Sequence, residues 1–211
     1  MLKKISLLFL FNLTVIFCVA QNEEEELPPL FHYSGNDYLL KIEKKYFRSD
    51  PYSNSFGFFV KHLMDDPTLA SKTTRLKTDT SFFYFQGIYK NHNPFGFVAG
   101  RTEIKLAEKE FLNNDSLNTK DTLFVYQLLG FNYKGKPGLE SVKNEFSKFE
   151  RHYGKHFIVE SSDIKKDSEI VGGRQDYYVY GFDDSPLSIA WSKIDEQQSV
   201  FVITLFLKRQ Y

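Results

Sequence analysis

The chain has 211 residues and carries 27 basic and 27 acidic side chains, so its formal net charge is zero. This length suits one domain or two very small ones. Nothing in this neutral composition suggests the concentrated basic surface that phosphate-driven affinity requires, so we expect no nucleic acid among its partners.

The first twenty residues have the pattern of a signal peptide. Lys3 and Lys4 form the positive start, residues 5–17 the apolar run, and residues 18–20 a small-x-small cleavage site. The run is short for a membrane span, so we expect none in the mature chain, although retention as an anchor stays open. Cleavage would leave 25 basic and 27 acidic residues and remove the one cysteine, Cys18, which excludes thiol catalysis. We therefore expect an exported protein, periplasmic or extracellular.

Residues 21–55 are expected to precede the folded domain. Four consecutive glutamates, residues 23–26, and the Pro28-Pro29 pair are typical of a solvated spacer. Residues 38–46 have apolar side chains at both helical and strand spacings, so their structure stays open. Residues 56–211 are expected to form a single domain.

The first half of that domain reads as a helix followed by three strands. Apolar residues share one helical face over residues 56–64: Phe56, Phe59, Val60 and Leu63. Residues 65–67, Asp-Asp-Pro, end this helix. Aromatic and β-branched residues predict strands over residues 81–90, 95–108 and 122–133. Apolar and charged residues alternate over residues 102–106, which indicates that one face of that strand is wet.

The second half repeats this order. Apolar residues at helical spacing predict a helix over residues 139–153 that lies across a sheet: Leu139, Val142, Phe146, Phe149 and Tyr153. Gly154 is expected to end it in the left-handed conformation. Strands are predicted over residues 176–182, 187–194 and 200–207, a short strand over residues 157–160 stays open, and residues 161–175 read as a long exposed loop.

These elements predict the α+β class. Consecutive strands are joined by turns rather than by helical crossovers, so the sheet should be antiparallel. We expect about six strands with two helices packed on one face, arranged as two similar helix-plus-three-strand halves. Whether the halves share one sheet stays open.

The sequence has no strong motif for catalysis, phosphate binding or metal binding. No Gly-x-Ser-x-Gly or His-Glu-x-x-His pattern occurs, and the acidic pairs at residues 65–66 and 183–184 adjoin prolines, as turn residues do. Residues 130–136 have phosphate-loop spacing, but Pro137 stands where a hydroxyl should hold magnesium, so we expect no cofactor. His152 and His156 have the spacing of two metal ligands on a helix, although charge complementarity at the helix end also explains His152.

The aromatic strand over residues 176–182 suggests a binding surface. Tyr178, Tyr180 and Phe182 alternate with Tyr177 along it. The sheet face without helices is either covered by the N-terminal segment and loops or presents tyrosines to a protein, peptide or glycan. We therefore predict an exported, non-catalytic binding protein of the cell envelope that uses these four residues or residues 161–175.

Three other classes stay open. They are a hydrolase that uses His152, His156 and a carboxylate, a structural envelope component, and a carrier of an apolar ligand. The sequence leaves the oligomeric state open.

Overall fold

The computed structural model describes residues 36–48, 56–78, 81–96, 100–112, 120–180 and 185–208. In chain order the elements are α2 (Asp37–Phe47), α3 (Phe56–Asp65), β1 (Leu69–Thr78), β2 (Ser81–Tyr89), β3 (Arg101–Leu112), β4 (Lys120–Asn132), α4 (Lys136–Tyr153), the 3-10 turn η1 (Gly154–His156), β5 (Ile158–Lys166), β6 (Glu169–Tyr178), β7 (Leu187–Lys193) and β8 (Ser199–Lys208). The predicted signal peptide, the acidic spacer, Phe182 and the acidic pair at residues 183–184 lie outside the described residues.

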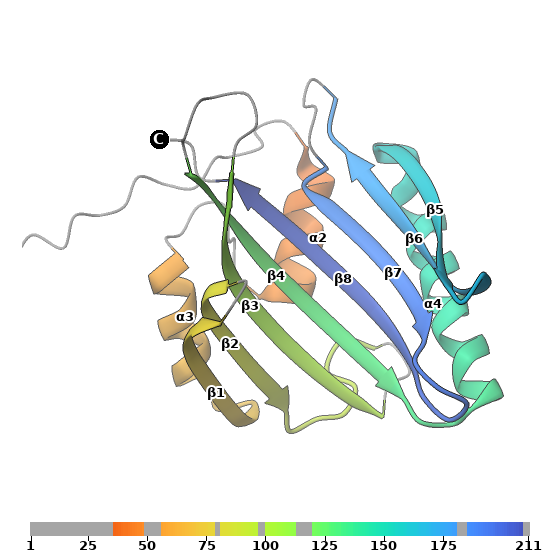
Figure 1. The fold of residues 1–211 in the computed structure, drawn as a ribbon, viewed down its shortest axis with the longest axis horizontal. Coiled ribbons are helices and arrows are strands. Elements are labelled where there is room, and N and C mark those ends of the chain that lie inside the picture. Colours follow the sequence, from red (N-terminus) through yellow and green to blue (C-terminus); the bar gives the residue numbers. More distant parts are fainter. Residues whose placement is uncertain are drawn as a thin grey trace, which may run out of the picture.

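All eight strands form one antiparallel sheet in the order β1-β2-β3-β4-β8-β7-β6-β5 (Figure 1). The two halves of the chain meet where β4 pairs with β8, in a ladder that runs from Leu123–Lys208 to Asn132–Ser199. The predicted antiparallel sheet is therefore confirmed, and the halves share it. Each half, however, contributes four strands rather than three, so the expected count of about six was too low.

The extra strands are polar and lie at or next to the edges of the sheet. Strand β1 forms one edge, and its sequence gave no strand signal. The predicted loop over residues 161–175 is wrong, because these residues belong to the hairpin of β5 and β6, which turns at Asp167 and Ser168 in the left-handed region. Strand β5 is the other edge, where charged side chains discourage pairing with a second molecule.

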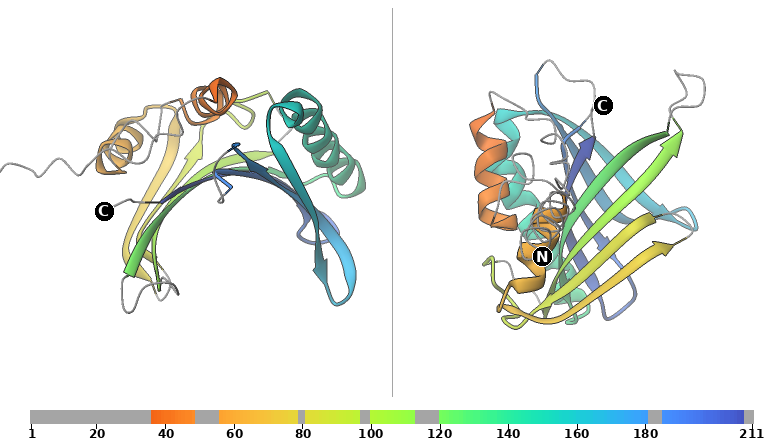
Figure 2. Two further views of the ribbon diagram at one scale, coloured as in Figure 1. Left: turned by 90° about the horizontal axis from the view of Figure 1, so that it is seen from above. Right: turned by 90° about the vertical axis from the view of Figure 1, so that its left-hand side faces the viewer.

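Helices α2, α3 and α4 all lie along one face of the sheet, and the sheet arches so that this face is convex (Figure 2). Two helices were expected. The third is α2, formed by the segment whose structure the sequence left open. None of the described helices is long and apolar enough to span a membrane.

The core lies between these helices and the convex face. Alternate residues of β4 and β8 point into it, among them Tyr126, Leu128 and Ile203. Helix α4 adds a buried stripe, as predicted, of Val142, Phe149 and Tyr153, with Leu139 and Phe146 partly buried beside it.

A glycine stands at each end of α4, and only the first has an unusual backbone conformation. Gly135 precedes the helix with φ of 58°, a value that side chains disfavour, and Pro137 follows in the first turn. Gly154 has φ of −53° and ψ of −38°, so the predicted left-handed end is wrong. The chain instead tightens into η1 before β5 begins.

Helix α2 begins at a side-chain cap. The Asn36 Oδ1 atom accepts hydrogen bonds from the backbone N–H groups of Tyr38 and Leu39, both at 3.0 Å. Asn36→Ala removes both acceptors, so we expect the free energy of unfolding, measured by urea denaturation, to fall by about 1 kcal/mol. Asn36→Asp keeps the acceptor and should stay close to the wild-type value. Equal stability of the alanine and aspartate variants would show that the cap is not needed.

Candidate functional site on the concave face

The concave face carries the side chains that alternate with the core along each strand. None of the described helices lies on this face (Figure 2). Val125, Phe131 and Val200 point this way, because they are buried but are not part of the core cluster.

A row of polar side chains crosses the concave face through all eight strands. Its members are paired directly in register, and we call them the polar row: Thr73, Gln86, Lys105, Gln127, Thr204, Ser188, Asp176 and Glu160. At its centre, where the halves of the chain meet, the Gln127 amide donates to the Thr204 hydroxyl at 3.4 Å. The wet strand face predicted for residues 102–106 supplies Lys105 and Glu103 to this surface.

Apolar side chains flank the centre of the polar row. Leu129 of β4 pairs with Val202 of β8 on one side of Gln127 and Thr204, and Val125 pairs with Phe206 on the other. Leu129, Val202 and Phe206 are each partly exposed. The middle of the concave face therefore combines a polar line with accessible apolar surface.

A charged cluster on β2 and β3 borders this centre. The Glu103 carboxylate forms ion pairs with Arg101 at 2.7 Å and with Lys105 at 3.5 Å, and it accepts a hydrogen bond from the Gln86 amide at 2.7 Å. Glu103 is only 2 % exposed, so this carboxylate depends on these partners. The Arg101 guanidinium lies over the Phe131 ring, 4.8 Å from its centroid.

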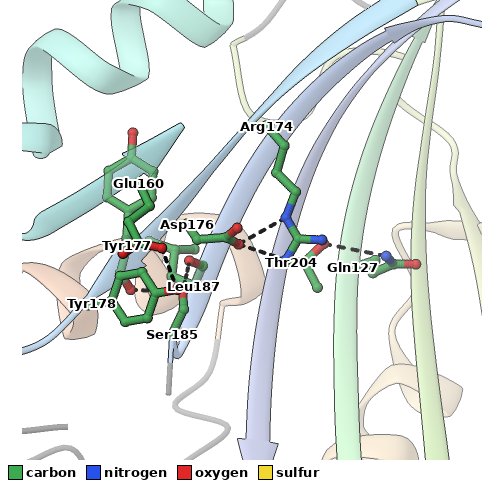
Figure 3. Close-up of polar contacts among 9 residues, drawn as sticks. All are labelled: Gln127, Glu160, Arg174, Asp176, Tyr177, Tyr178, Ser185, Leu187 and Thr204. Atoms are coloured by element: carbon green, nitrogen blue, oxygen red, sulfur yellow. Dashed lines mark hydrogen bonds and ion pairs between the residues drawn. The ribbon is translucent and has the colours of Figure 1, made fainter. Parts of the chain in front are cut away.

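A similar arrangement lies on the opposite arm of the sheet, which is formed by β5 and β6 (Figure 3). Arg174 of β6 donates from Nε and Nη2 to Asp176 Oδ1, at 2.9 and 2.7 Å, and its guanidinium lies 6.0 Å from the Phe206 centroid. Beside it the Tyr178 hydroxyl donates to Glu160 of β5 at 3.1 Å, and this hydrogen bond raises the pKa of Tyr178. Both arms therefore present an arginine–carboxylate pair held over a phenylalanine ring.

The structure does not bring the four predicted aromatic residues to one surface. Tyr177 lies in the core, edge-on to Phe149, and its hydroxyl donates to Gln175 at 2.9 Å; burial raises its pKa. Tyr178 points to the concave face. Tyr180 is 90 % exposed beyond the end of β6. Phe182 lies outside the described residues.

The main chain around Tyr177 is fixed by a serine that lies two residues before β7. The Ser185 hydroxyl lies within hydrogen-bond distance of two backbone carbonyls, that of Tyr177 at 3.0 Å and that of Leu187 at 2.7 Å (Figure 3). The position of Tyr178 on the concave face is thereby coupled to the β6–β7 connection.

The two histidines proposed as metal ligands have aromatic neighbours. His152 is exposed and meets the Tyr153 ring edge-on at 4.4 Å. The His156 ring stacks on Tyr38, with centroids 3.3 Å apart. Within the described part of the chain, no three His, Cys, Asp or Glu side chains gather in a way that could hold a metal ion.

Stacking on Tyr38 gives His156 a testable titration. Desolvation lowers the pKa of His156 below its ordinary value of 6.5, and the positive charges of Lys155, Lys41 and His152 lower it further. The folded chain therefore binds this proton less readily than the unfolded chain, so stability should fall as the pH drops below 6.5. In NMR titrations of the imidazole, Tyr38→Ala should raise the pKa of His156, whereas Tyr38→Phe should leave it low. An unchanged pKa in the alanine variant would contradict this cause.

A cavity of about 260 Å³ lies on the other side of the molecule, between α2 and α4. Charged and polar side chains stand in its walls, including Lys45, Glu145, Lys148 and His152. Burial and the nearby Glu145 raise the pKa of Tyr46, at its rim, to about 12. These walls do not form the dry apolar space that a carrier of an apolar ligand needs.

Only parts of the charged groups on the concave face could be predicted from the sequence. Arg101 and Glu103, like Arg174 and Asp176, are two residues apart, which places each pair on one face of a strand. Their position relative to the centre depends on the strand order, which no local pattern contains.

No family model, curated protein or solved structure matches this chain.

Proposed function

We propose that the chain is an exported, non-catalytic binding protein of the cell envelope that holds a protein partner against the concave face of its sheet. The observation that carries the proposal is the polar row, which crosses all eight strands on the face opposite the helices. Export is part of the proposal and is supported by the signal-peptide pattern of residues 1–20.

The size and composition of the face favour a protein over a small molecule. Eight strands at about 4.8 Å spacing give an arc of roughly 35–40 Å, the breadth of another domain's convex surface. Partly exposed Leu129, Val202 and Phe206 lie at the centre, and charged pairs lie toward both arms. An apolar centre with a polar rim is typical of protein interfaces.

The net charges of the two halves of the concave face favour one orientation of the partner. On β3, Arg101 and Lys105 share the single carboxylate of Glu103, and Arg75 lies near the β1 edge. On β5 and β6, Asp176 and Glu160 outnumber the single Arg174. A matching partner would therefore place acidic side chains against β1–β3 and basic side chains against β5–β6, which favours one direction of docking.

Two charge-matched variants test the proposal. Ala190 is a small, partly exposed residue of the concave face whose register neighbours are Arg174 and Val202, so Ala190→Glu adds bulk to the docking surface while its charge meets Arg174. Asn144→Glu adds the same charge on the exposed side of α4. We expect capture from an envelope extract to recover a partner with the wild type and Asn144→Glu. The Ala190→Glu variant should bind that purified partner at least tenfold more weakly. Equal affinity of all three proteins would contradict the proposal.

A further inference from the structure

A second candidate site lies at the outer end of the convex face, away from the polar row. It is a cavity of about 310 Å³ between α4 and the β5–β6 hairpin. The rings of Phe146 and Trp191 form its apolar walls, and Ser161, Asp163 and Gln175 supply polar groups. This volume is at the lower end of the range for small-molecule sites.

One glycine of β6, Gly173, leaves the space open. A Cβ atom on Gly173 would lie 2.7 Å from Trp191 Nε1. The indole therefore rests directly on the backbone of β6. Its N–H group is brought to the cavity wall by the absence of a side chain at Gly173.

Several polar groups of this cavity are available to a ligand. Among the described residues, the Trp191 N–H, the Asp163 carboxylate and the Ser161 hydroxyl have no hydrogen-bond or ion-pair partner. The Gln175 side chain is held by the Tyr177 hydroxyl at 2.9 Å, so its amide is fixed in direction. A donor, an acceptor and a hydroxyl that acts as both thus line one small space.

The charges around the cavity disfavour an anionic ligand. Asp163 brings a negative charge to the lining, and Lys143, whose Nζ lies 4.9 Å from the Trp191 ring centroid, is paired with Glu140 at 3.7 Å. Arg174 also reaches the lining, but its guanidinium is paired with Asp176. No unpaired positive charge is therefore left in the lining to attract an anion, and the Asp163 carboxylate is available as a hydrogen-bond acceptor.

We propose that this cavity binds one neutral hexopyranose unit of a glycan. The apolar C–H face of a pyranose ring suits Trp191 and Phe146, and its adjacent hydroxyls, each both donor and acceptor, suit Asp163, Ser161 and the indole N–H. The site is separate from the concave face and does not depend on the function proposed for it.

The chain's one tryptophan makes the test specific to this site. Indole fluorescence and the single indole ¹H–¹⁵N cross-peak are followed while glucose, galactose or N-acetylglucosamine is added to the full chain. We expect at least one sugar to give a saturable change, with a dissociation constant of about 1–10 mM. No saturable change with any of the three would overturn the proposal, as would tighter binding of choline or inorganic phosphate.

Matched variants show whether the named groups hold the sugar. Asp163→Asn removes the strongest acceptor and should weaken binding at least tenfold, whereas Asp167→Asn, at the tip of the same hairpin, should leave it unchanged. Gly173→Ala should shift the free indole cross-peak and abolish the sugar response. Unchanged affinity in the folded Asp163→Asn variant would contradict the assignment, and its fold is checked by the remainder of the same NMR spectrum.

Discussion

Replacing Phe149 with alanine is expected to lower the free energy of unfolding by about 3–5 kcal/mol, because it opens a cavity in the core. Phe149 is a buried residue of α4. Its ring centroid lies 4.7 Å from that of Tyr153, 5.7 Å from that of Tyr177 and 6.0 Å from that of Tyr46. The side chain therefore joins α2, α4 and β6. Urea denaturation followed by circular dichroism measures the loss.

Asn144→Ala, on the exposed side of the same helix, is the matched control. It should change stability by no more than about 0.5 kcal/mol, since surface substitutions away from special contacts rarely do more. A loss for Phe149→Ala as small as that of the control would mean that α4 does not pack on the sheet as described.

Replacing Glu103 with alanine should cost about 2 kcal/mol of stability. The substitution leaves the Gln86 amide without its acceptor and leaves Arg101 and Lys105 as neighbouring like charges. The two cations are 40 % and 26 % exposed at their side chains and can regain water, which keeps the loss below that of a fully buried pair. Denaturant unfolding of the wild type and the Glu103→Ala variant, at low and at moderate salt, measures this loss of stability.

Glu160→Ala provides the comparison on the opposite arm, because Glu160 is exposed and has one hydrogen bond, from Tyr178. The free energy of unfolding of the Glu160→Ala variant should fall by no more than about 0.5 kcal/mol. If both variants lose the same amount, Glu103 is not the buried centre of a charged cluster.

Helix α4 could be predicted because its signals are local. The stripe of Leu139, Val142, Phe146, Phe149 and Tyr153 repeats at the helical period within one segment, so the face that packs on the sheet is determined by the sequence itself. The antiparallel pairing could also be predicted from local signals, because no helix stands between consecutive strands within either half.

The edge strands could not be predicted in this way. Strands β1 and β5 are held by backbone hydrogen bonds to β2 and β6, and their sequences are largely polar, so they resemble loops. Helix α2 had a signal that was available, the Asn36-Asp37 start and the Lys44-Lys45 end, which the mixed spacing of its apolar residues obscured.

The candidate site could not be predicted without the strand register, which determines which residues of neighbouring strands lie opposite each other. The alternation of Tyr177 and Tyr178 was visible in the sequence, but which of them lies in the core depends on the pairing of Tyr177 with Leu187. The polar row is assembled from eight separate strands, and residues as ordinary as Gln127 and Thr204 become its centre only through the pairing of β4 with β8.

Site-specific photo-crosslinking tests the proposed docking face most directly. Benzoylphenylalanine is placed at Gln127, at the centre of the polar row, or at Asn144 on the far side of α4, in the full chain expressed in its native cells. We predict a covalent adduct with one partner protein from position 127 and none from position 144. An adduct from position 144 alone, or no adduct from position 127, would contradict a partner held in the arch of the sheet.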